Sequence, residues 1–296
     1  MNSLLVAMRV ARYTPRSVMR TGAWAAANVG YVRKTKARRR LEGNLALVTG
    51  LEGKPLARLT RQGLLSSARY YAEVLELPRM TPAQIKARVR MENEDRPLSC
   101  IDDNNGAVVV LSHSGNWDLV GAKSVLELAP VSAVAEVLKP PEVFAEFVAL
   151  RERVGIRIYG HSDSGTFRGL LREAGSAEKR LLALVADRDM TGRGVEVTMW
   201  GHGVRVAPGP AALAIAAKSS LLPLMVHYER LHGARRRAAR SRWGTVMSFG
   251  PVLQTANYTG EGAVDRLSQD WASWIADAIA AHPQDWHMLQ RFGWIE

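Results

Sequence analysis

The residues best suited to chemistry lie in one short run, Ser112-His113-Ser-Gly-Asn-Trp-Asp118. An alcohol is a poor nucleophile at neutral pH, and an imidazole can act as the base that takes its proton. A carboxylate that accepts the Nδ1–H of that imidazole orients the ring and stabilises the imidazolium. We therefore predict that His113 is a general base oriented by Asp118. The spacing alone is weak evidence, because a His and an Asp five apart also occur by chance in many proteins.

The elements around this run support a site. Residues 107–112 form a short β-branched run typical of a buried parallel strand, and a helix is predicted from Trp117. Open α/β sheets bind ligands at the carboxyl ends of their strands, which is where His113 falls. Gly115 permits a tight bend that places Asp118 in the first helical turn, and its N–H could approach a developing oxyanion.

The rest of the chain alternates between strand and helix patterns. Predicted strands are 131–135, 156–159, 181–186, 221–227 and 245–249, and predicted helices are 141–154 and 166–174. This alternation indicates an α/β fold with a mainly parallel central sheet flanked by helices. Nothing divides the chain, so we expect one domain over residues 1–296.

The first third is predicted to be helical, with a helical stripe over 55–77. Thr81 before Pro82 is typical of an N-cap that opens a helix through about Arg88. Two later stretches are predicted to be irregular. The arginine-rich residues 235–242 are interpreted as an exposed loop between strands, and Pro208-Gly-Pro210 as a backbone turn.

The chain carries a formal net charge of +12. Such a charge draws a protein toward nucleic acid, anionic lipid or phosphorylated cofactors, but no nucleic-acid recognition motif is present. The single Cys100 excludes an internal disulfide framework and a multi-cysteine zinc site. No run of the length needed to span a membrane is free of charge, and no secretory signal is evident.

Residues 1–30 form a basic, partly amphipathic segment that could lie in a bilayer interface. Its apolar members are Leu4, Leu5, Met8, Val10 and Ala11, and its basic members are Arg9, Arg12 and Arg16. A helix packed on the core with a solvated basic face is an equally open interpretation.

Other kinds of catalysis have weaker support. The Gly-x-Ser-x-Gly pattern of a serine nucleophile is missing around Ser114, so direct transfer is predicted rather than a covalent intermediate. The histidines at 202, 227, 282 and 287 lack the spacing of metal ligands, and we expect no metal and no cofactor.

The histidine run with its strand resembles the glycerolipid and lipid A late acyltransferase superfamily, and most closely the actinobacterial phosphatidylinositol mannoside acyltransferases. Further blocks are similar in the same order over about residues 40–292. They are Glu136-Val-Leu-Lys-Pro140, Phe147-Val-Ala-Leu-Arg151-Glu152, Ala186-Asp-Arg-Asp189, Gly194-Val-Glu-Val197 with Gly201, Pro208-Gly-Pro-Ala211 and His282-Pro-Gln-Asp-Trp-His287.

The resemblance implies a peripheral enzyme at the cytoplasmic face of the cell membrane. It would transfer a long-chain acyl group from acyl-CoA, typically palmitoyl-CoA, to the 6-hydroxyl of a mannose on a phosphatidylinositol mannoside. The implied partners are acyl-CoA, a glycolipid acceptor and an anionic membrane surface, and we expect a monomer. Residues 40–292 would be the catalytic core, and 1–30 the membrane-contact segment.

By position, Glu136, Arg151 and Asp187 correspond to polar residues that the family keeps around the histidine and the acceptor sugar. We also expect substrate contacts from Arg188, Glu196, Gly115 and Asn116. Arg151 and Arg188 could instead bind phosphates of the coenzyme or hold Asp187 and Glu136. Position 187 is Asp where close relatives commonly carry Glu, and Thr198-Met-Trp200 replaces a more usual aromatic pair.

Two other activities remain open. One is acylation of a different lipid, such as a lysophospholipid or another glycolipid. The other is a lipid esterase or thioesterase in which the same histidine activates water.

Overall fold

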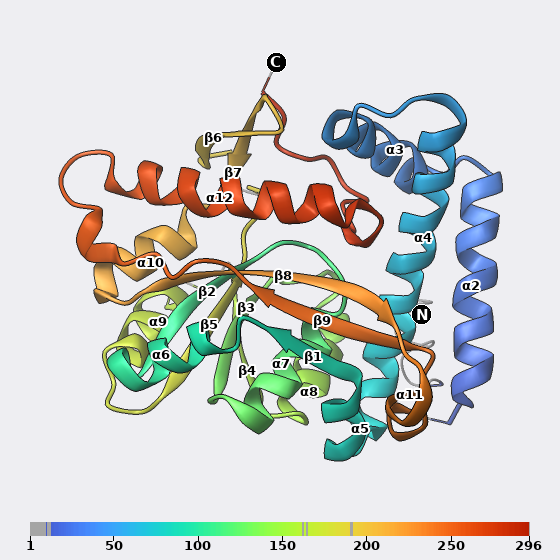
Figure 1. Cartoon of the computed structure of the whole chain (residues 1–296), viewed down its shortest axis with the longest axis horizontal. Coiled ribbons are helices and arrows are strands. Elements are labelled where there is room, and N and C mark those ends of the chain that lie inside the picture. Colours follow the sequence, from blue (N-terminus) through green and yellow to red (C-terminus); the bar gives the residue numbers. More distant parts are fainter. Residues whose placement is uncertain (1–9, 11–12, 162, 164, 190–191, 296) are drawn as a thin grey trace.

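The computed structural model of the chain describes residues 10, 13–161, 163, 165–189 and 192–295. Its centre is a seven-stranded sheet in the order β1-β9-β8-β2-β5-β3-β4 (Figure 1). The strands are β1 Val89–Glu92, β2 Gly106–Leu111, β3 Val131–Ala135, β4 Ile156–Gly160, β5 Arg180–Val185, β8 Leu221–Arg230 and β9 Trp243–Phe249. Within this sheet β8 and β9 pair antiparallel and every other pair of described strands is parallel, so the predicted mainly parallel sheet is confirmed.

The central strand β2 is buried along its whole length, as its Val-rich sequence predicts. Its side chains alternate between two hydrophobic clusters on opposite faces of the sheet. Val108 and Val110 belong to a cluster that includes residues of α9, α10 and α12, whereas Val109 belongs to a cluster that includes residues of α5 to α8. The sheet is therefore covered by helices on both faces.

The helices of the described residues include those expected over 55–77, 82–88, 141–154 and 166–174 and from Trp117, each close to its predicted bounds. They are α2 Arg16–Val32, α3 Lys36–Thr49, α4 Gly53–Glu76, α5 Pro82–Arg88, α6 Asp95–Asn104, α7 Trp117–Glu127, α8 Pro141–Glu152, α9 Thr166–Ala174, α10 Gly209–Ala217, α11 Gly233–Ala239 and α12 Ala263–Ala281, with short 3₁₀ turns η1 Leu77–Arg79, η2 Thr255–Asn257 and η3 Pro283–Asp285. Thr81 caps α5 by accepting a hydrogen bond from the N–H of Gln84, as expected.

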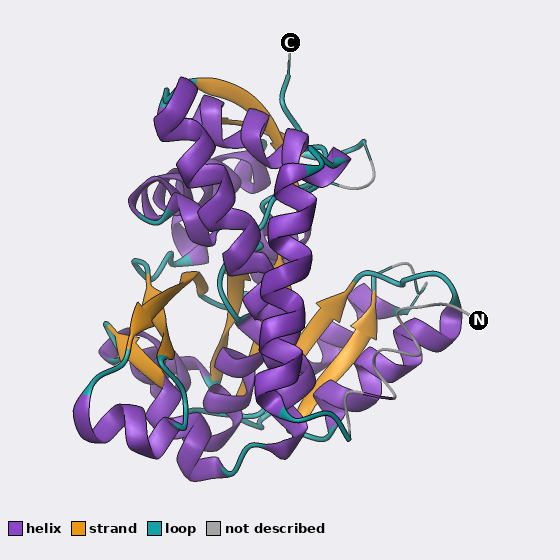
Figure 2. Cartoon of the chain, turned by 90° about the vertical axis from the view of Figure 1, so that its right-hand side faces the viewer, coloured by secondary structure: helices purple, strands orange, loops and turns teal. Residues whose placement is uncertain are grey.

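Helices α2, α3 and α4 stand together beside the sheet, and α2 packs along α4 (Figure 1). Viewed from the side of α2, helices lie in front of the strands (Figure 2). No helix among the described residues is long and apolar enough to cross a membrane. Most of the residues that define the predicted amphipathic pattern of the N-terminus, Leu4 to Arg9 with Ala11 and Arg12, lie outside the described part of the chain.

Two local predictions are wrong, and one element was not predicted. Residues 233–239 form the helix α11 rather than a loop, because the three arginines and the alanines after them are good helix formers. Pro208 precedes the helix α10 rather than closing a turn. The antiparallel hairpin of β6 Val195–Met199 and β7 His202–Val206 was not foreseen. Its two strands alternate exposed and buried residues, unlike the buried β2.

Candidate active site

The turn that carries His113 is shaped by a glycine. Gly115 has φ +54°, and a Cβ there would lie 2.6 Å from the carbonyl oxygen of Val226. Its N–H donates to the carbonyl of Asp285 at 2.9 Å. The glycine is thus required by the bend, as expected, but the structure already uses its N–H and does not offer it to an oxyanion.

The carboxylate that holds His113 is Asp187, not Asp118. The Nδ1 of His113 lies 2.5 Å from Oδ1 of Asp187, and the backbone N–H of His113 donates to Oδ2 of the same carboxylate at 3.0 Å. The prediction that Asp118 accepts the Nδ1–H is therefore wrong. Asp118 lies in the first turn of α7 with its carboxylate turned toward α4 and α8.

Sheet topology explains the pairing with Asp187. Strands β2 and β5 are parallel neighbours in which Leu111 is opposite Val185. His113 and Asp187 each lie two residues beyond those partners, so the register brings them together. The histidine is half-buried and the aspartate fully buried.

Asp187 is well supplied with hydrogen-bond donors. The indole Nε1–H of Trp286 donates to its Oδ2 at 2.8 Å. Burial by itself would raise the pKa of Asp187, but the charge of His113 and the hydrogen bonds from His113 and Trp286 outweigh burial and lower it. The carboxylate stays ionised and can stabilise a protonated His113.

Asp118 instead forms a buried polar group with two helices. Its Oδ2 accepts from the Tyr70 hydroxyl at 2.8 Å, and its Oδ1 accepts from Nε of Arg151 at 2.6 Å. Burial opposes the charged form of Arg151, but the charge of Asp118 outweighs it, and the pKa of Arg151 is raised. Arg151 therefore holds a carboxylate, which is one of the roles left open for it, although the carboxylate is Asp118 and not Asp187 or Glu136.

Of the other predicted site residues, Glu136 and Arg188 lie near Asp187, whereas Glu196 lies on the β6–β7 hairpin. Arg188 pairs with the half-exposed Glu136 at 3.6 Å and also hydrogen-bonds Gln290, so these residues lie together beside Asp187. Glu196 is exposed on the β6–β7 hairpin, where it pairs with Arg205 at 2.6 Å. This pairing within the hairpin does not link Glu196 to the histidine.

Asn116 has a structural role that its type predicts. Its Oδ1 accepts from the N–H of Leu119 and caps α7, while its Nδ2 donates to Oε2 of Glu73 at 2.9 Å. Both Asn116 and Glu73 are buried. The histidine turn is therefore tied to α4 through Asn116 and Glu73.

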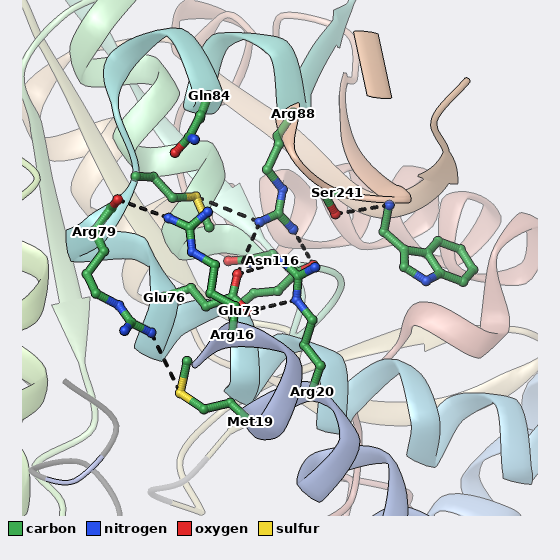
Figure 3. A network of polar contacts seen from close by, with 12 residues as sticks. Arg16, Met19, Arg20, Glu73, Glu76, Arg79, Gln84, Arg88, Asn116 and Ser241 are labelled. Carbon is green, nitrogen blue, oxygen red and sulfur yellow. Dashed lines mark hydrogen bonds and ion pairs between the residues drawn. The ribbon is translucent and has the colours of Figure 1, made fainter. Parts of the chain in front are cut away.

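Glu73 belongs to a buried charge network that continues to α2 (Figure 3). Its Oε1 pairs with Arg88, which also lies 3.9 Å from Glu76. Glu76 in turn accepts two hydrogen bonds of 2.7 Å from Arg20 of α2. The buried carboxylates of Glu73 and Glu76 therefore pair with Arg88 and with Arg20 of α2.

A C-terminal segment completes the site, and its contacts could not be read from its sequence. The N–H of His287 donates to the carbonyl of His113 at 2.7 Å, next to the Trp286 bond to Asp187. Asp285 accepts from Ser66 at 2.6 Å, and the Ser66 Oγ lies 3.0 Å from Nε2 of His287. Trp286 and Trp271 of α12 are both fully buried.

The pair of His113 and Asp187 can act as a general base. No group of three or more potential ligands from His, Cys, Asp and Glu was found among the described residues. With Nδ1–H donated to Asp187, the remaining Nε2 of His113 has a lone pair that can accept a proton. Such a pair suits the activation of a hydroxyl or of water.

Comparison with known proteins indicates which class of reaction this chain catalyses. The family model described as bacterial lipid A biosynthesis acyltransferase matches residues 3–292. The chain is 34% identical over 270 residues to the phosphatidylinositol mannoside acyltransferase of Mycolicibacterium smegmatis, covering 89% of this chain and 82% of the relative. It is 33% identical over 260 residues to the phosphatidylinositol mannoside acyltransferase of Mycobacterium tuberculosis (strain CDC 1551 / Oshkosh), covering 84% and 75%.

Among solved structures, the 1-acyl-sn-glycerophosphate acyltransferase PlsC from Thermotoga maritima aligns with a TM-score of 0.38 and 10% identity over 90% of this chain and 95% of that one. The family match spans nearly the whole chain and includes the histidine turn and the segment that closes over it. The chain therefore belongs to the bacterial lipid A biosynthesis acyltransferase family and is an enzyme that transfers acyl groups.

Proposed function

We propose that this enzyme transfers a long-chain acyl group from acyl-CoA to the 6-hydroxyl of a mannose on a phosphatidylinositol mannoside. The observation that carries the proposal is the pair of His113 and Asp187 at the carboxyl ends of two neighbouring parallel strands. The relatives named as phosphatidylinositol mannoside acyltransferases support the choice of acceptor.

In the proposed mechanism, His113 Nε2 takes the proton of the sugar hydroxyl while Asp187 stabilises the imidazolium. The sugar oxygen attacks the thioester carbonyl and forms the new C–O bond. The tetrahedral intermediate collapses as the C–S bond breaks. The imidazolium then returns its proton to the leaving thiolate, so that coenzyme A departs as a thiol and His113 is neutral again.

Asp118, Arg151 and Tyr70 have a different role in this proposal. They form one buried group beside the histidine turn, and each partner holds the next in a fixed orientation. We propose that this group shapes the wall against which the acceptor sugar lies, while Glu136 and Arg188 bound the opening. The family resemblance supports both placements, since Glu136 and Arg151 match positions kept around the sugar.

Membrane attachment is part of the proposal, because both substrates carry long apolar chains. Helix α2 turns its charged residues inward. The exposed positions of this fully described helix are all uncharged, whereas Arg16 and Arg20 face the protein. Val18, Trp24, Val29 and Val32 are among its exposed apolar residues. An apolar outer face on a strongly basic protein suits contact with an anionic membrane surface.

The test is transfer of radiolabelled palmitate from palmitoyl-CoA to a panel of purified acceptors. Wild-type enzyme is expected to acylate phosphatidylinositol mannosides and His113→Ala to lose that transfer. Acylation of a lysophospholipid but not of the mannosides would reject the acceptor, and full activity in His113→Ala would reject the base. Release of free palmitate at a comparable rate without any acceptor would indicate a thioesterase.

A further inference from the structure

A cavity outside the histidine site lies between the end of α4 and one face of α8. Its volume is about 210 Å³. On one side it is lined by Leu75 of α4 and by Pro78 and Arg79 of η1, and on the other by Glu146, Ala149 and Leu150 of α8 and by Arg153, the C-cap of α8. The last four residues are spaced i, i+3, i+4 and i+7 and so share one helix face. The lining of this groove combines apolar and charged side chains.

The charges around the groove favour an anion. Two arginines line it against a single carboxylate, that of Glu146. A third arginine is close by, since Arg16 Nη2 donates to the carbonyl of Arg79 at 3.0 Å. Burial lowers the pKa of Arg16; the charge of Glu76 opposes this change, and the charges of Arg20, Arg79 and Arg88 lower the pKa further. An anion in the groove would relieve this crowding of positive charge.

The groove is placed between the catalytic site and the proposed membrane face. On α4, Tyr71 and Leu75 lie one turn apart, and Arg79 follows in η1, which continues α4. Tyr71 is half-exposed. Burial raises the pKa of its hydroxyl, and the charge of the nearby Glu136 carboxylate raises it further. Glu136 pairs with Arg188, the residue after Asp187. From Tyr71 to Arg79 the helix rises about 12 Å.

At its far end the groove meets the beginning of α2. The guanidinium Nη1 of Arg79 donates to the carbonyl of Thr14 at 3.1 Å, just before α2 begins. The outer face of α2 is the uncharged face described above. A ligand could therefore place a sugar near Glu136, an anionic group at the groove and apolar chains along α2.

We infer that the groove between α4 and α8 binds the phosphodiester of the glycolipid acceptor through Arg79 and Arg153. This inference rests on the proposed function and adds a second point of recognition to it. Binding the phosphate at a set distance from His113 selects an acceptor in which sugar rings separate the reactive hydroxyl from the phosphodiester. Arg79 and Arg153 are then specificity-determining residues.

The test compares Arg79→Ala/Arg153→Ala with a matched control, Arg168→Ala/Arg172→Ala, which removes two exposed charges from α9 at the other end of the molecule (Figure 1). Two acceptors are used, a phosphatidylinositol mannoside and octyl α-mannoside, which has no phosphate. The groove variant is expected to raise KM for the first acceptor about tenfold and to leave its kcat unchanged. KM for octyl mannoside and for acyl-CoA should stay within about twofold, as should all constants of the control.

An equal rise of KM for both acceptors, or no rise, would overturn the inference. A rise confined to acyl-CoA would assign the groove to the donor and overturn it as well. Calorimetric titration with glycerophosphoinositol, with inositol as the control, tests the groove independently of turnover. Binding that weakens about tenfold in the groove variant supports the inference even if no mannoside is acylated and the proposed function fails, whereas no binding to wild type rejects it.

Discussion

At the scale of single residues, two aspartates near His113 have opposite partners. Asp187 accepts two hydrogen bonds from His113, whereas Asp118 is held by Arg151 and Tyr70. The carboxylate that follows the histidine most closely in the sequence is therefore not the one that holds it. Mutating each aspartate separately should therefore change different kinetic constants.

Asp187→Asn is expected to reduce kcat about 10²- to 10⁴-fold, because the neutral amide cannot stabilise a protonated His113. Asp118→Asn keeps the His113 pair and is expected to affect KM for the acceptor more than kcat. Steady-state kinetics at saturating acyl-CoA distinguishes the two. A larger loss of kcat in Asp118→Asn than in Asp187→Asn would show that the pairing in the structure is not the catalytic one.

His287 predicts a pH dependence of stability. Burial first, with smaller effects of nearby charges, lowers the pKa of His287 to about 3. The unfolded chain binds this proton near pH 6.5, so the contribution of His287 to stability is complete above that pH and declines as the pH falls toward 3. Between pH 6.5 and 4.5 wild type should lose about 2 kcal/mol more than His287→Gln.

Urea unfolding at several pH values measures this difference. Gln is chosen because it keeps an N–H that can reach Ser66 but does not titrate. His202→Gln, on the exposed start of β7, serves as the control and should follow wild type. Parallel curves for wild type and His287→Gln would contradict the assignment of a buried neutral imidazole.

The error at Asp118 shows what could be predicted for the site. The bend at Gly115 could be predicted from sequence because it is local, whereas Asn116 was expected to contact substrate and instead caps α7. The partner of His113 lies 74 residues away and depends on strand order and register. Position 187 was identified only through the family resemblance, as a polar residue near the histidine. Two predicted strands that end in polar residues were the available signal, but their adjacency was not known.

At the scale of elements, the strand, turn and helix around His113 depend on Gly115. Gly115→Ala is expected to destabilise the protein by about 1–3 kcal/mol, since both the positive φ and the contact with Val226 oppose a side chain. Gly50, which ends α3, also has a positive φ of +64° but has open space around it. A substitution there therefore measures the cost of the positive φ without the cost of a close contact. Gly50→Ala should cost about 1 kcal/mol. Thermal unfolding compares them, and equal losses would mean that the contact with Val226 is unimportant.

The link between α2 and α4 gives a second prediction at this scale. Arg20→Met removes the partner that accounts for two hydrogen bonds to the fully buried Glu76. Because Arg20 is itself partly exposed, the expected cost is about 1–2 kcal/mol. Limited proteolysis should then cut α2 faster than in wild type. Arg33→Met, at the exposed C-cap of α2, is the control, and equal cleavage of both variants would contradict the link.

Most elements could be predicted from local sequence, and the exceptions have physical reasons. The strand at 131–135 and the helix at 166–174 were assigned to the residue, because apolar runs and capping residues mark their ends. The short β1 has half-buried and exposed residues, and the β6–β7 hairpin has no turn signal that stands out from its surroundings. Such strands form because a neighbouring strand supplies their hydrogen bonds.

At the scale of the whole molecule, the outer face of α2 and the net charge of +12 predict membrane binding. Val18→Glu/Val29→Glu should weaken binding to vesicles of phosphatidylcholine with phosphatidylserine at least about tenfold, by removing apolar contact and adding negative charge. Leu98→Glu, at another exposed apolar position on α6, should not. Sedimentation with vesicles measures both, and equal binding of the α2 variant and wild type would reject α2 as the contact.

The segment that closes over His113 has a consequence for when the site can form during synthesis. Asp285, Trp286 and His287 contact Gly115, Asp187 and His113, so the site is assembled from parts of the chain that leave the ribosome far apart in time. A nascent chain that has reached residue 280 already contains His113 and Asp187 but not the Trp286 indole that donates to Asp187. The hydrogen bonds that join this segment to the histidine turn can therefore form only after residue 287 has been translated.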